Sequence, residues 1–403
     1  MCWYSGRKYR PRIEATGARF LPFEHAPDYD DARFSDEFPE RARLSGLSQL
    51  KFDMKHVFID GAPGQLRDLR RICDDVQPAV VVGDPGMLGA LFHHEQGGPP
   101  LAILFVLPLT VNSVDAAPFG LGLPPSASAL GRMRNRALNA LVEHVLFRDV
   151  QGHWNRTRRQ LGLDPTGWWL NAVDRAAVCM QPTIPSLEYP RRDLPPNVTF
   201  IGMIPAEAPA DWTPPDFFSE LDGPRPVVHV TQGTIANETP ALIGPALAGL
   251  AGEEVLVVVS TGGRPVESLG LRDVPRNARF STFLSYPALL PKTAVMVTNG
   301  GYGGVQIALS YGVPLVVAGE TEDKPEVASR VAWAGAGVNL KTATPAPERV
   351  RAAVRTLLHE PAYRERARSL AAEYARYDAL AQAVAAIESV AAAGPAHWRN
   401  RPT

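Results

Sequence analysis

The sequence predicts an α/β protein of two domains, each built around a parallel β-sheet. Apolar runs of strand length alternate with helix-length segments in both halves of the chain, and this order is typical of parallel sheets covered by helices. Most of the runs are apolar at consecutive positions, as expected for strands that are buried on both faces. A length of 403 residues and a hydrophobic content of 45% suffice for two ordinary cores.

The first half contains four expected strands and four helical stretches. The strands are residues 2–4, 18–22, 78–82 and 101–107, and the helical stretches are 44–58, 64–73, 86–94 and 129–162. Proline then becomes frequent between residues 190 and 226 without a regular apolar period, as in segments that join domains. We therefore expect a first domain at 1–205 and a linker at 206–225.

The second half repeats the alternation of strands and helices. Strands are expected at 227–231, 255–260, 279–283, 294–298 and 313–318, and helices at 240–251, 305–311 and between 346 and 390. Residues 226–375 would form the second domain. The remaining segment, 376–403, is rich in alanine and long enough to pack back on the first domain.

A glycine-rich turn at residues 299–304 joins one of these strands to a helix and predicts an anion site. Small residues free the backbone N–H groups at a helix N-terminus, where the helix dipole favours a phosphate. Gly233 and the pair Gly262-Gly263 follow two other strands of the same sheet, and Thr231 and Thr234 add hydroxyl groups. Since parallel sheets bind ligands at the carboxyl ends of their strands, we expect a phosphate-lined cleft there.

Local patterns leave several alternatives open. One alternative is a nicotinamide-binding site with a G-x-G-x-x-G motif that begins at Gly301. Gln306, however, stands where the third glycine of that motif belongs. Phe283 is either a core residue or a ring that stacks on a base, and the pair Asp323-Lys324 either binds sugar hydroxyls or forms a surface ion pair. The D-x-D pattern at residues 28–30 is of a kind that holds divalent metals, but it lies in an acidic loop, and no metal is expected.

Composition limits the partners and the compartment. The net charge of −1 offers no electrostatic reason to expect nucleic acid or an anionic membrane. Cys2, Cys73 and Cys179 lie far apart, which indicates a reduced, cytosolic protein without structural zinc or disulfide bonds. No apolar run approaches the roughly 20 residues that span a bilayer, and the first residues do not form a signal peptide.

Residues 226–340 resemble the donor-binding domain of the GT-B glycosyltransferases, in particular the UDP-glycosyltransferase-like family that includes macrolide and flavonoid glycosyltransferases. The family pattern is His-Gly-Gly-x-Gly-Thr, a helix, Gly-Val-Pro, a strand and Asp-Gln. Its counterparts here are residues 299–304, Gly312-Val313-Pro314 and Asp323-Lys324, in the same order. The resemblance extends weakly through the first half. It implies two Rossmann-like domains whose parallel sheets face each other across a cleft.

The resemblance implies that the second domain binds a UDP- or TDP-sugar without a metal or other cofactor. The pyrophosphate would lie at the N-terminus of the helix that follows the glycine-rich turn. Phe283 would stack on the base, backbone groups at Leu284 would bind its edge, and Asp323 would bind sugar hydroxyls. The expected donor-binding residues are Thr231, Gly233, Thr234, Gly263, Phe283, Leu284, Asn299, Gly300, Gly301, Tyr302, Gly303, Gly304, Gln306, Asp323 and Lys324.

Three positions depart from the family pattern in the donor site. Asn299 replaces a histidine that contacts a phosphate, and its amide can still donate a hydrogen bond. Ile307 replaces a glutamate that binds the ribose, so that this contact is lost or passes to Gln306. Lys324 replaces a glutamine that binds sugar hydroxyls, which leaves the donor sugar unspecified.

The largest departure is at the front of the chain. Family members begin with a strand, a loop with a Gly-His pair and a helix, ahead of a strand that resembles residues 2–4. Their histidine is the general base, and Asp84 matches the carboxylate that orients it; alternatively, Asp84 caps the end of a strand. The histidines without a family counterpart are expected to be solvated polar residues, and they are His25, His56, His93 and His94.

The expected function is transfer of a hexose to a hydroxyl of a hydrophobic small molecule (a macrolide, polyketide or flavonoid-like compound), with inversion at the anomeric carbon. Residues 105–115 and 118–119 are candidates for the acceptor pocket. Because the base-bearing segment is not found, we expect little transfer activity from this chain. The alternatives are a non-catalytic member that binds a nucleotide sugar or supports a partner enzyme, and an epimerase. The oligomeric state is not indicated.

Overall fold

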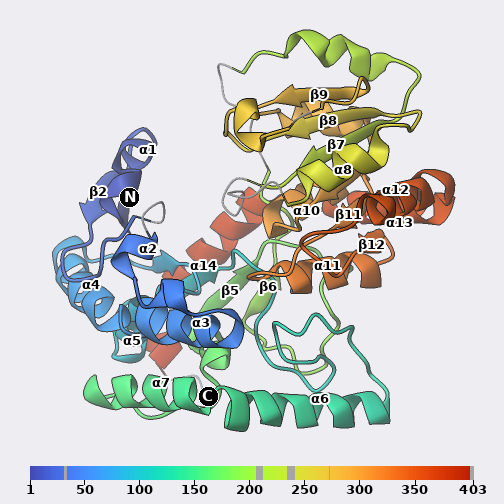
Figure 1. Ribbon diagram of the computed structural model, residues 1–403. Coiled ribbons are helices and arrows are strands. Elements are labelled where there is room, and N and C mark those ends of the chain that lie inside the picture. Colours follow the sequence, from blue (N-terminus) through green and yellow to red (C-terminus); the bar gives the residue numbers. More distant parts are fainter. Residues whose placement is uncertain (31–33, 206–211, 234–240, 272, 400–403) are drawn as a thin grey trace.

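A computed structural model describes residues 1–30, 34–205, 212–233, 241–271 and 273–399. They form two α/β domains, with the chain ends in or against the first (Figure 1). None of the described helices combines the length and the apolar content that crossing a bilayer requires.

The sheet of the first domain is divided into two parts. Four parallel strands lie in the order β3-β4-β5-β6, and β1 and β2 form a separate parallel pair. The bounds are β1 Cys2–Ser5, β2 Arg19–Pro22, β3 Val81–Gly83, β4 Leu101–Leu104, β5 Val178–Gln181 and β6 Val198–Phe200. Among the described residues, β1 pairs only with β2 and β3 only with β4. Trp3 on β1 and Val82 on β3 are each 47% exposed.

The described residues of this domain form seven α-helices ahead of β5, of which α1 packs on the separate pair beside β2. They are α1 Arg10–Glu14, α2 Phe34–Glu37, α3 Gly46–Phe52, α4 Ala62–Val76, α5 Leu88–Glu95, α6 Ala129–Leu141 and α7 Arg148–Gln160. Phe92 of α5 and Trp154 of α7 are fully buried in the main core of this domain, together with Leu101 of β4. The indole nitrogen of Trp154 donates to the hydroxyl of Thr166 at 2.8 Å, which satisfies its polar atom.

The second domain has one continuous sheet of six parallel strands, in the order β12-β11-β10-β7-β8-β9. The strands are β7 Val227–Thr231, β8 Leu256–Ser260, β9 Ala278–Ser281, β10 Thr293–Thr298, β11 Leu315–Val317 and β12 Gly337–Asn339. The helices are α8 Ile243–Leu250, α9 Tyr286–Leu289, α10 Tyr302–Ser310, α11 Lys324–Trp333, α12 Pro347–His359, α13 Pro361–Tyr374 and α14 Ala379–Arg399. In this order the chain reverses direction across the sheet between β7 and β10, which is the point where such sheets open a crevice.

Helix α14 returns to the first domain and packs on its sheet (Figure 1). Val390 lies in a small core with Met180 of β5 and Ile201. The middle of the predicted linker also has a structure, because Asp216–Asp222 forms a 3-10 helix in which Leu221 packs against Leu256 of β8. Residues 206–211 of that linker lie outside the described residues.

Seven of the described strands and α-helices were not among those expected from the sequence. They are α1, α2, β5 and β6 in the first domain, and α9, α11 and β12 in the second. Strand β6 lies within the proline-rich stretch and pairs with β5 along its whole length, so this part of the stretch belongs to the first sheet. Helix α11 begins at Lys324, directly after the acidic segment 320–323.

Candidate active site

The carboxyl ends of β7 and β10 meet at the centre of the second sheet and form the floor of the candidate site. Thr298 of β10 lies opposite Thr231 of β7 in the parallel register. The side-chain amide of Asn299 donates to the backbone carbonyl of Gln232, which ties the two turns together. Asn299 was expected to contact a phosphate, but one of its N–H groups is thus used inside the protein.

The glycine-rich turn leaves the N-terminus of α10 open. Gly300 has φ +88° and a Cβ there would lie 2.7 Å from Val317, so only glycine fits. Gly301 is the residue before the helix and no side chain caps its first amides. A Cβ at Gly301 or Gly303 would meet nothing within 4 Å. Among the described residues, the first turn of α10 thus has no side-chain cap and leaves room for added atoms at Gly301 and Gly303, as an anion site at a helix N-terminus requires.

Tyr302 contributes only its backbone to this helix end. Its side chain is buried, and its hydroxyl accepts a hydrogen bond of 2.8 Å from the amide of Gln181 at the end of β5. This contact joins the first turn of α10 to the sheet of the first domain. Gly304 lies in the same turn, and the hydroxyl of Tyr286 would be 3.9 Å from a Cβ there.

The turns after β7 and β8 lie at the same edge of the sheet. The hydroxyl of Thr231 accepts from Ser260 at 3.0 Å and from the amide of Gly233 at 3.4 Å. The amide of Gly263, which has φ +93°, donates to the carbonyl of Thr282 after β9 at 2.8 Å. Thr234, also expected in the donor site, lies outside the described residues.

Phe283 and Leu284 differ in their exposure. The ring of Phe283 is 45% exposed, so it is not a core residue, and its carbonyl accepts from the hydroxyl of Ser281 at 2.8 Å. Leu284 is buried in a core with Val227 and Leu256, and only its backbone is left for a ligand. An anchored loop with one exposed aromatic ring suits stacking on a base.

The carboxylate of Asp323 stands just before α11 without a side-chain partner among the described residues. Burial, together with repulsion from Glu322, raises its pKa to about 6. A desolvated carboxylate beside a ligand cleft is typical of functional sites. Its neighbour Lys324 is buried and directs its ammonium group to Glu322 and to the hydroxyl of Thr321. Lys324 is therefore engaged within its own loop.

The two residues considered for the ribose contact, Gln306 and Ile307, both pack within the protein. Gln306 is buried and its side-chain oxygen accepts from the hydroxyl of Tyr374 at 3.0 Å. Ile307 packs against the core beneath α10. The expectation that a ribose contact passes to Gln306 has no support in this geometry.

On the first-domain side, Asp84 follows β3 and is exposed. Its carboxylate accepts from the amide of Gly86 at 2.7 Å. This contact is the strand-end cap that the sequence left open as the alternative role of Asp84. Among the described residues, no hydrogen bond links a histidine to Asp84. The four histidines without a family counterpart are not all solvated, because burial lowers the pKa of both His93 and His94.

His25 instead pairs with a buried carboxylate. Its Nδ1 lies 2.7 Å from Asp68, which also accepts from the hydroxyl of Tyr4 and from the amides of residues 24–26. Burial alone would raise the pKa of Asp68, but the hydrogen bonds from these amides, from the Tyr4 hydroxyl and from His25 hold that pKa well below its usual range. The group fixes the loop after β2, and the ring of His25 is half-exposed. Only the spacing of Asp68 on an apolar helix face hinted at this in the sequence.

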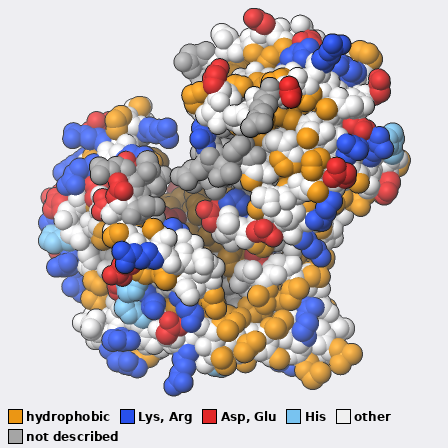
Figure 2. All heavy atoms as spheres, viewed as in Figure 1, with side chains coloured by type: hydrophobic (Ala, Val, Ile, Leu, Met, Phe, Trp, Pro, Cys, Tyr) orange, Lys and Arg blue, Asp and Glu red, His pale blue; other side chains and the backbone are white. Residues whose placement is uncertain are grey.

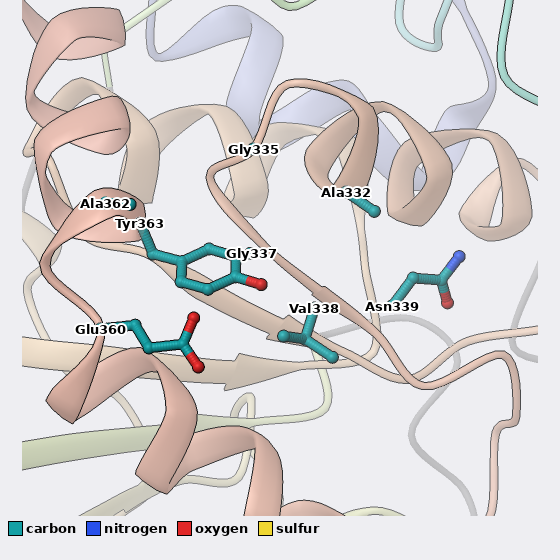
Figure 3. Close-up of a pocket in the computed structure, with 8 residues that line it drawn as sticks. All are labelled: Ala332, Gly335, Gly337, Val338, Asn339, Glu360, Ala362 and Tyr363. Carbon is teal, nitrogen blue, oxygen red and sulfur yellow. The ribbon is translucent and has the colours of Figure 1, made fainter.

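A deep groove separates the two lobes (Figure 2). A separate hollow of about 520 Å³ lies beside β12, at the outer edge of the second sheet, and is lined by Val338, Glu360 and Tyr363 among others (Figure 3). None of its lining residues belongs to the glycine-rich turns. The site described above is therefore distinct from this hollow.

The sequence is similar to known proteins over nearly its whole length. Residues 247–389 match the family model for the erythromycin biosynthesis protein CIII-like C-terminal domain. The chain is 44% identical over 390 residues to 4'-demethylrebeccamycin synthase of Lentzea aerocolonigenes, covering 96% of this chain and 92% of that protein. It is 34% identical over 406 residues to UDP-glycosyltransferase 2 of Phaeomoniella chlamydospora, covering 96% and 89%.

Solved structures of low sequence identity share the fold. The glycotransferase of kitacinnamycin has a TM-score of 0.68 at 22% identity and covers 96% of this chain and 90% of its own. The glycosyltransferase VinC, solved in complex with DTDP, has a TM-score of 0.68 at 21% identity and covers 97% and 92%. Their likeness to this chain extends across both domains.

Proposed function

Because the chain belongs to the GT-B glycosyltransferases, we propose that it transfers a hexose from a UDP- or TDP-sugar to a hydroxyl of a hydrophobic small molecule. One observation supports the choice of donor: among the described residues no side chain caps the N-terminus of α10, which lies beside the point where the strand order of the second sheet reverses. Such a helix end binds a diphosphate through its amides and its dipole.

In the proposed reaction the acceptor oxygen forms a bond to the anomeric carbon. The bond from that carbon to the diphosphate oxygen breaks, its electron pair stays on the diphosphate, and the acceptor proton passes to a base. A single displacement of this kind inverts the anomeric centre. The amides of residues 302–304 would stabilise the charge that develops on the leaving diphosphate, so that no metal is needed.

Other residues of the site would hold the rest of the donor. The half-exposed ring of Phe283 would stack on the base. The ionised carboxylate of Asp323 would accept hydrogen bonds from sugar hydroxyls, a role that suits a group without another side-chain partner. Lys324 would act indirectly, by neutralising Glu322 beside that carboxylate.

The acceptor class and the compartment are also proposals. The name of one similar protein, 4'-demethylrebeccamycin synthase, supports a small-molecule acceptor. The cysteines are all free, which supports a cytosolic location. That this chain has little transfer activity stays a prediction, and the similar proteins lend it no support. A non-catalytic binding role is the alternative that this prediction favours.

Calorimetry on the full chain in the presence of EDTA tests the proposal. TDP or UDP is expected to bind without a divalent metal, and Phe283→Ala is expected to weaken binding by about 5- to 100-fold, as loss of base stacking does. The variant should unfold at the same urea concentration as the parent, because the ring is half-exposed. Failure of both nucleotides to bind would contradict the proposed function.

A nucleotide sugar incubated with the chain separates transfer from epimerisation. Nuclear magnetic resonance of TDP-glucose should show no new TDP-hexose over time. Epimerisation needs acid and base side chains that face the sugar from both domains, and the sequence indicates no such set. Formation of a second TDP-hexose would replace the proposed reaction by the epimerase alternative.

A further inference from the structure

A carboxylate of the second domain holds a loop of the first. The side chain of Glu326, in the first turn of α11, is buried, and one of its oxygens accepts from the amides of Gly120 and Gly122, at 2.9 and 2.8 Å. These two amides, two residues apart, form a backbone nest around the carboxylate. Ser329, one turn further along, donates to the carbonyl of Gly122 at 2.6 Å.

The glycines are needed for this contact. Gly120 has φ +99° and Gly122 has φ +59°, a region that other residues rarely adopt. A Cβ at Gly122 would lie 2.9 Å from the carbonyl oxygen of Pro325 and 3.1 Å from the hydroxyl of Ser329. The loop backbone therefore touches α11 directly, and Figure 1 shows this segment passing below the helix.

The loop of residues 116–123, which contains Gly120 and Gly122, is anchored to the first domain at its N-terminal end. Asp115, just before this loop, accepts from Arg132 at 2.8 Å and from the amide of Arg192 at 3.1 Å. These contacts hold the pKa of Asp115 below its usual range, since Arg132 and Arg192 favour the charged form. Residues 116–123 thus bridge the two domains at the edge of the groove.

Further along the same face of α11, buried charges join the helix to the first domain. Arg330 donates to Glu188 from two nitrogens, at 3.0 and 2.7 Å, and to Glu326 at 2.6 Å, and its guanidinium lies 4.1 Å from the ring centre of Tyr189. Burial would raise the pKa of Glu188, but Arg330 and Arg191 lower it to about 2. Glu326 is therefore held in one orientation, with its second oxygen on Arg330.

Glu326 lies three residues after Asp323, and its backbone amide donates to the carbonyl of Asp323 at 3.0 Å at the start of α11. Asp323 is the group proposed to bind the donor sugar, and the loop held by Glu326 contains Pro118 and Phe119, candidates for the acceptor pocket. We propose that Glu326 is a positioning residue that couples occupation of the sugar site to the order of the acceptor loop 116–123. This inference rests on the proposed function, because it takes the sugar to bind at Asp323.

The coupling has a specific signature. A sugar bound at Asp323 restrains the first turn of α11, and Glu326 passes that restraint to the amides of the loop. TDP alone binds at α10 and leaves Asp323 without a ligand, so it restrains the loop less. A merely structural Glu326 would hold the loop equally with either ligand.

Hydrogen exchange of the full chain with TDP and with TDP-glucose tests this coupling. TDP-glucose is expected to slow exchange of the segment 116–123 by about tenfold beyond TDP, a change within the range of local opening equilibria. Glu326→Gln should abolish this sugar-dependent difference, while its affinity for TDP by calorimetry stays within about twofold of the parent. Glu95→Gln is the matched control, because it removes a buried carboxylate that pairs with Arg158 in the first domain.

Two loop variants keep the test decisive if Glu326→Gln unfolds. Ser329→Ala removes one hydrogen bond to the loop, and Gly122→Ala displaces the loop without changing a charge on α11. Each should reduce the sugar-dependent protection and leave TDP binding intact. Protection that is the same with TDP and TDP-glucose in the parent, or that survives in all the folded variants, overturns the inference alone. Absence of TDP binding in the parent overturns the proposed function, and this inference with it.

Discussion

The carboxyl edges of the two sheets differ in how their parts meet. In the second domain one continuous sheet brings the turns after β7, β8 and β10 to a single crevice, and these turns contain glycines with positive φ. In the first domain β1 and β2 form a pair that is separate from β3 to β6. The carboxylate of Asp84 there already accepts a hydrogen bond from the amide of Gly86. An anion site made of backbone amides is specified locally, whereas an acid–base site depends on which side chains the tertiary structure brings together.

The largest expected effect concerns a glycine that the donor side requires. Gly300→Val should destabilise the protein by about 2–5 kcal/mol, since it adds the strain of positive φ to overpacking against Val317. Gly17 in the first domain also has positive φ, but a Cβ there would meet nothing within 4 Å. Gly17→Val should therefore cost only about 1–2 kcal/mol. Urea unfolding measures both, and equal losses would show that packing around Gly300 is unimportant.

The next largest loss of stability is expected from a buried carboxylate of the first domain, Asp68. Asp68→Asn should destabilise the protein by about 2–4 kcal/mol, because an amide cannot accept all the hydrogen bonds that this buried carboxylate receives. The pKa of Asp68 is lowered in the folded state, so its stabilisation is present at neutral pH and is lost as the pH falls below the ordinary pKa of an aspartate.

An exposed carboxylate provides the control for this variant. Asp75 lies 3.9 Å from Arg19 and both side chains are largely exposed, so Asp75→Asn should change stability by less than about 0.5 kcal/mol. Similar unfolding midpoints for Asp68→Asn and Asp75→Asn would contradict the role given to Asp68.

The strands of the second domain were largely predictable from the sequence. The run 294–297 is apolar at every position because parallel strands are buried on both faces, and the glycines after it mark the turn to the next helix. The side chains were less predictable. Asn299, Gln306 and Lys324 were placed on the donor by pattern, yet each is bonded within the protein. Residues distant in sequence supply the partners of Asn299 and Gln306, and Lys324 is bonded within its own loop.

The elements that the sequence did not reveal are short or lack a period of their own. Strand β6 consists of Val198–Phe200 between prolines, and β12 of Gly337–Asn339 begins with glycine. Helix α11 starts inside an acidic, proline-containing stretch, and its buried charges Glu326 and Arg330 hide the apolar face. They are buried because the first domain supplies Glu188 and two backbone amides, which no local pattern indicates.

A smaller effect should separate stability from binding at Asp323. Its pKa is raised to about 6, above the ordinary value near 3.8, so ionisation destabilises the folded protein as the pH rises through 6. Asp323→Asn should therefore raise stability at pH 8 by about 1–3 kcal/mol and change it little at pH 4. The variant should also lose the extra affinity for TDP-glucose over TDP. An equal change of stability at the two pH values would contradict the raised pKa.

The most direct test of the diphosphate site replaces Gly303 in the first turn of α10. A side chain there meets no protein atom within 4 Å and fills the space proposed for the diphosphate. Gly152, on α7, is also a helical glycine with open space around it, and it provides the matched control. Calorimetry with TDP and UDP should show that Gly303→Leu lowers affinity by tenfold or more, about 1.4 kcal/mol, whereas Gly152→Leu leaves it unchanged. Unchanged nucleotide affinity in folded Gly303→Leu would contradict the account.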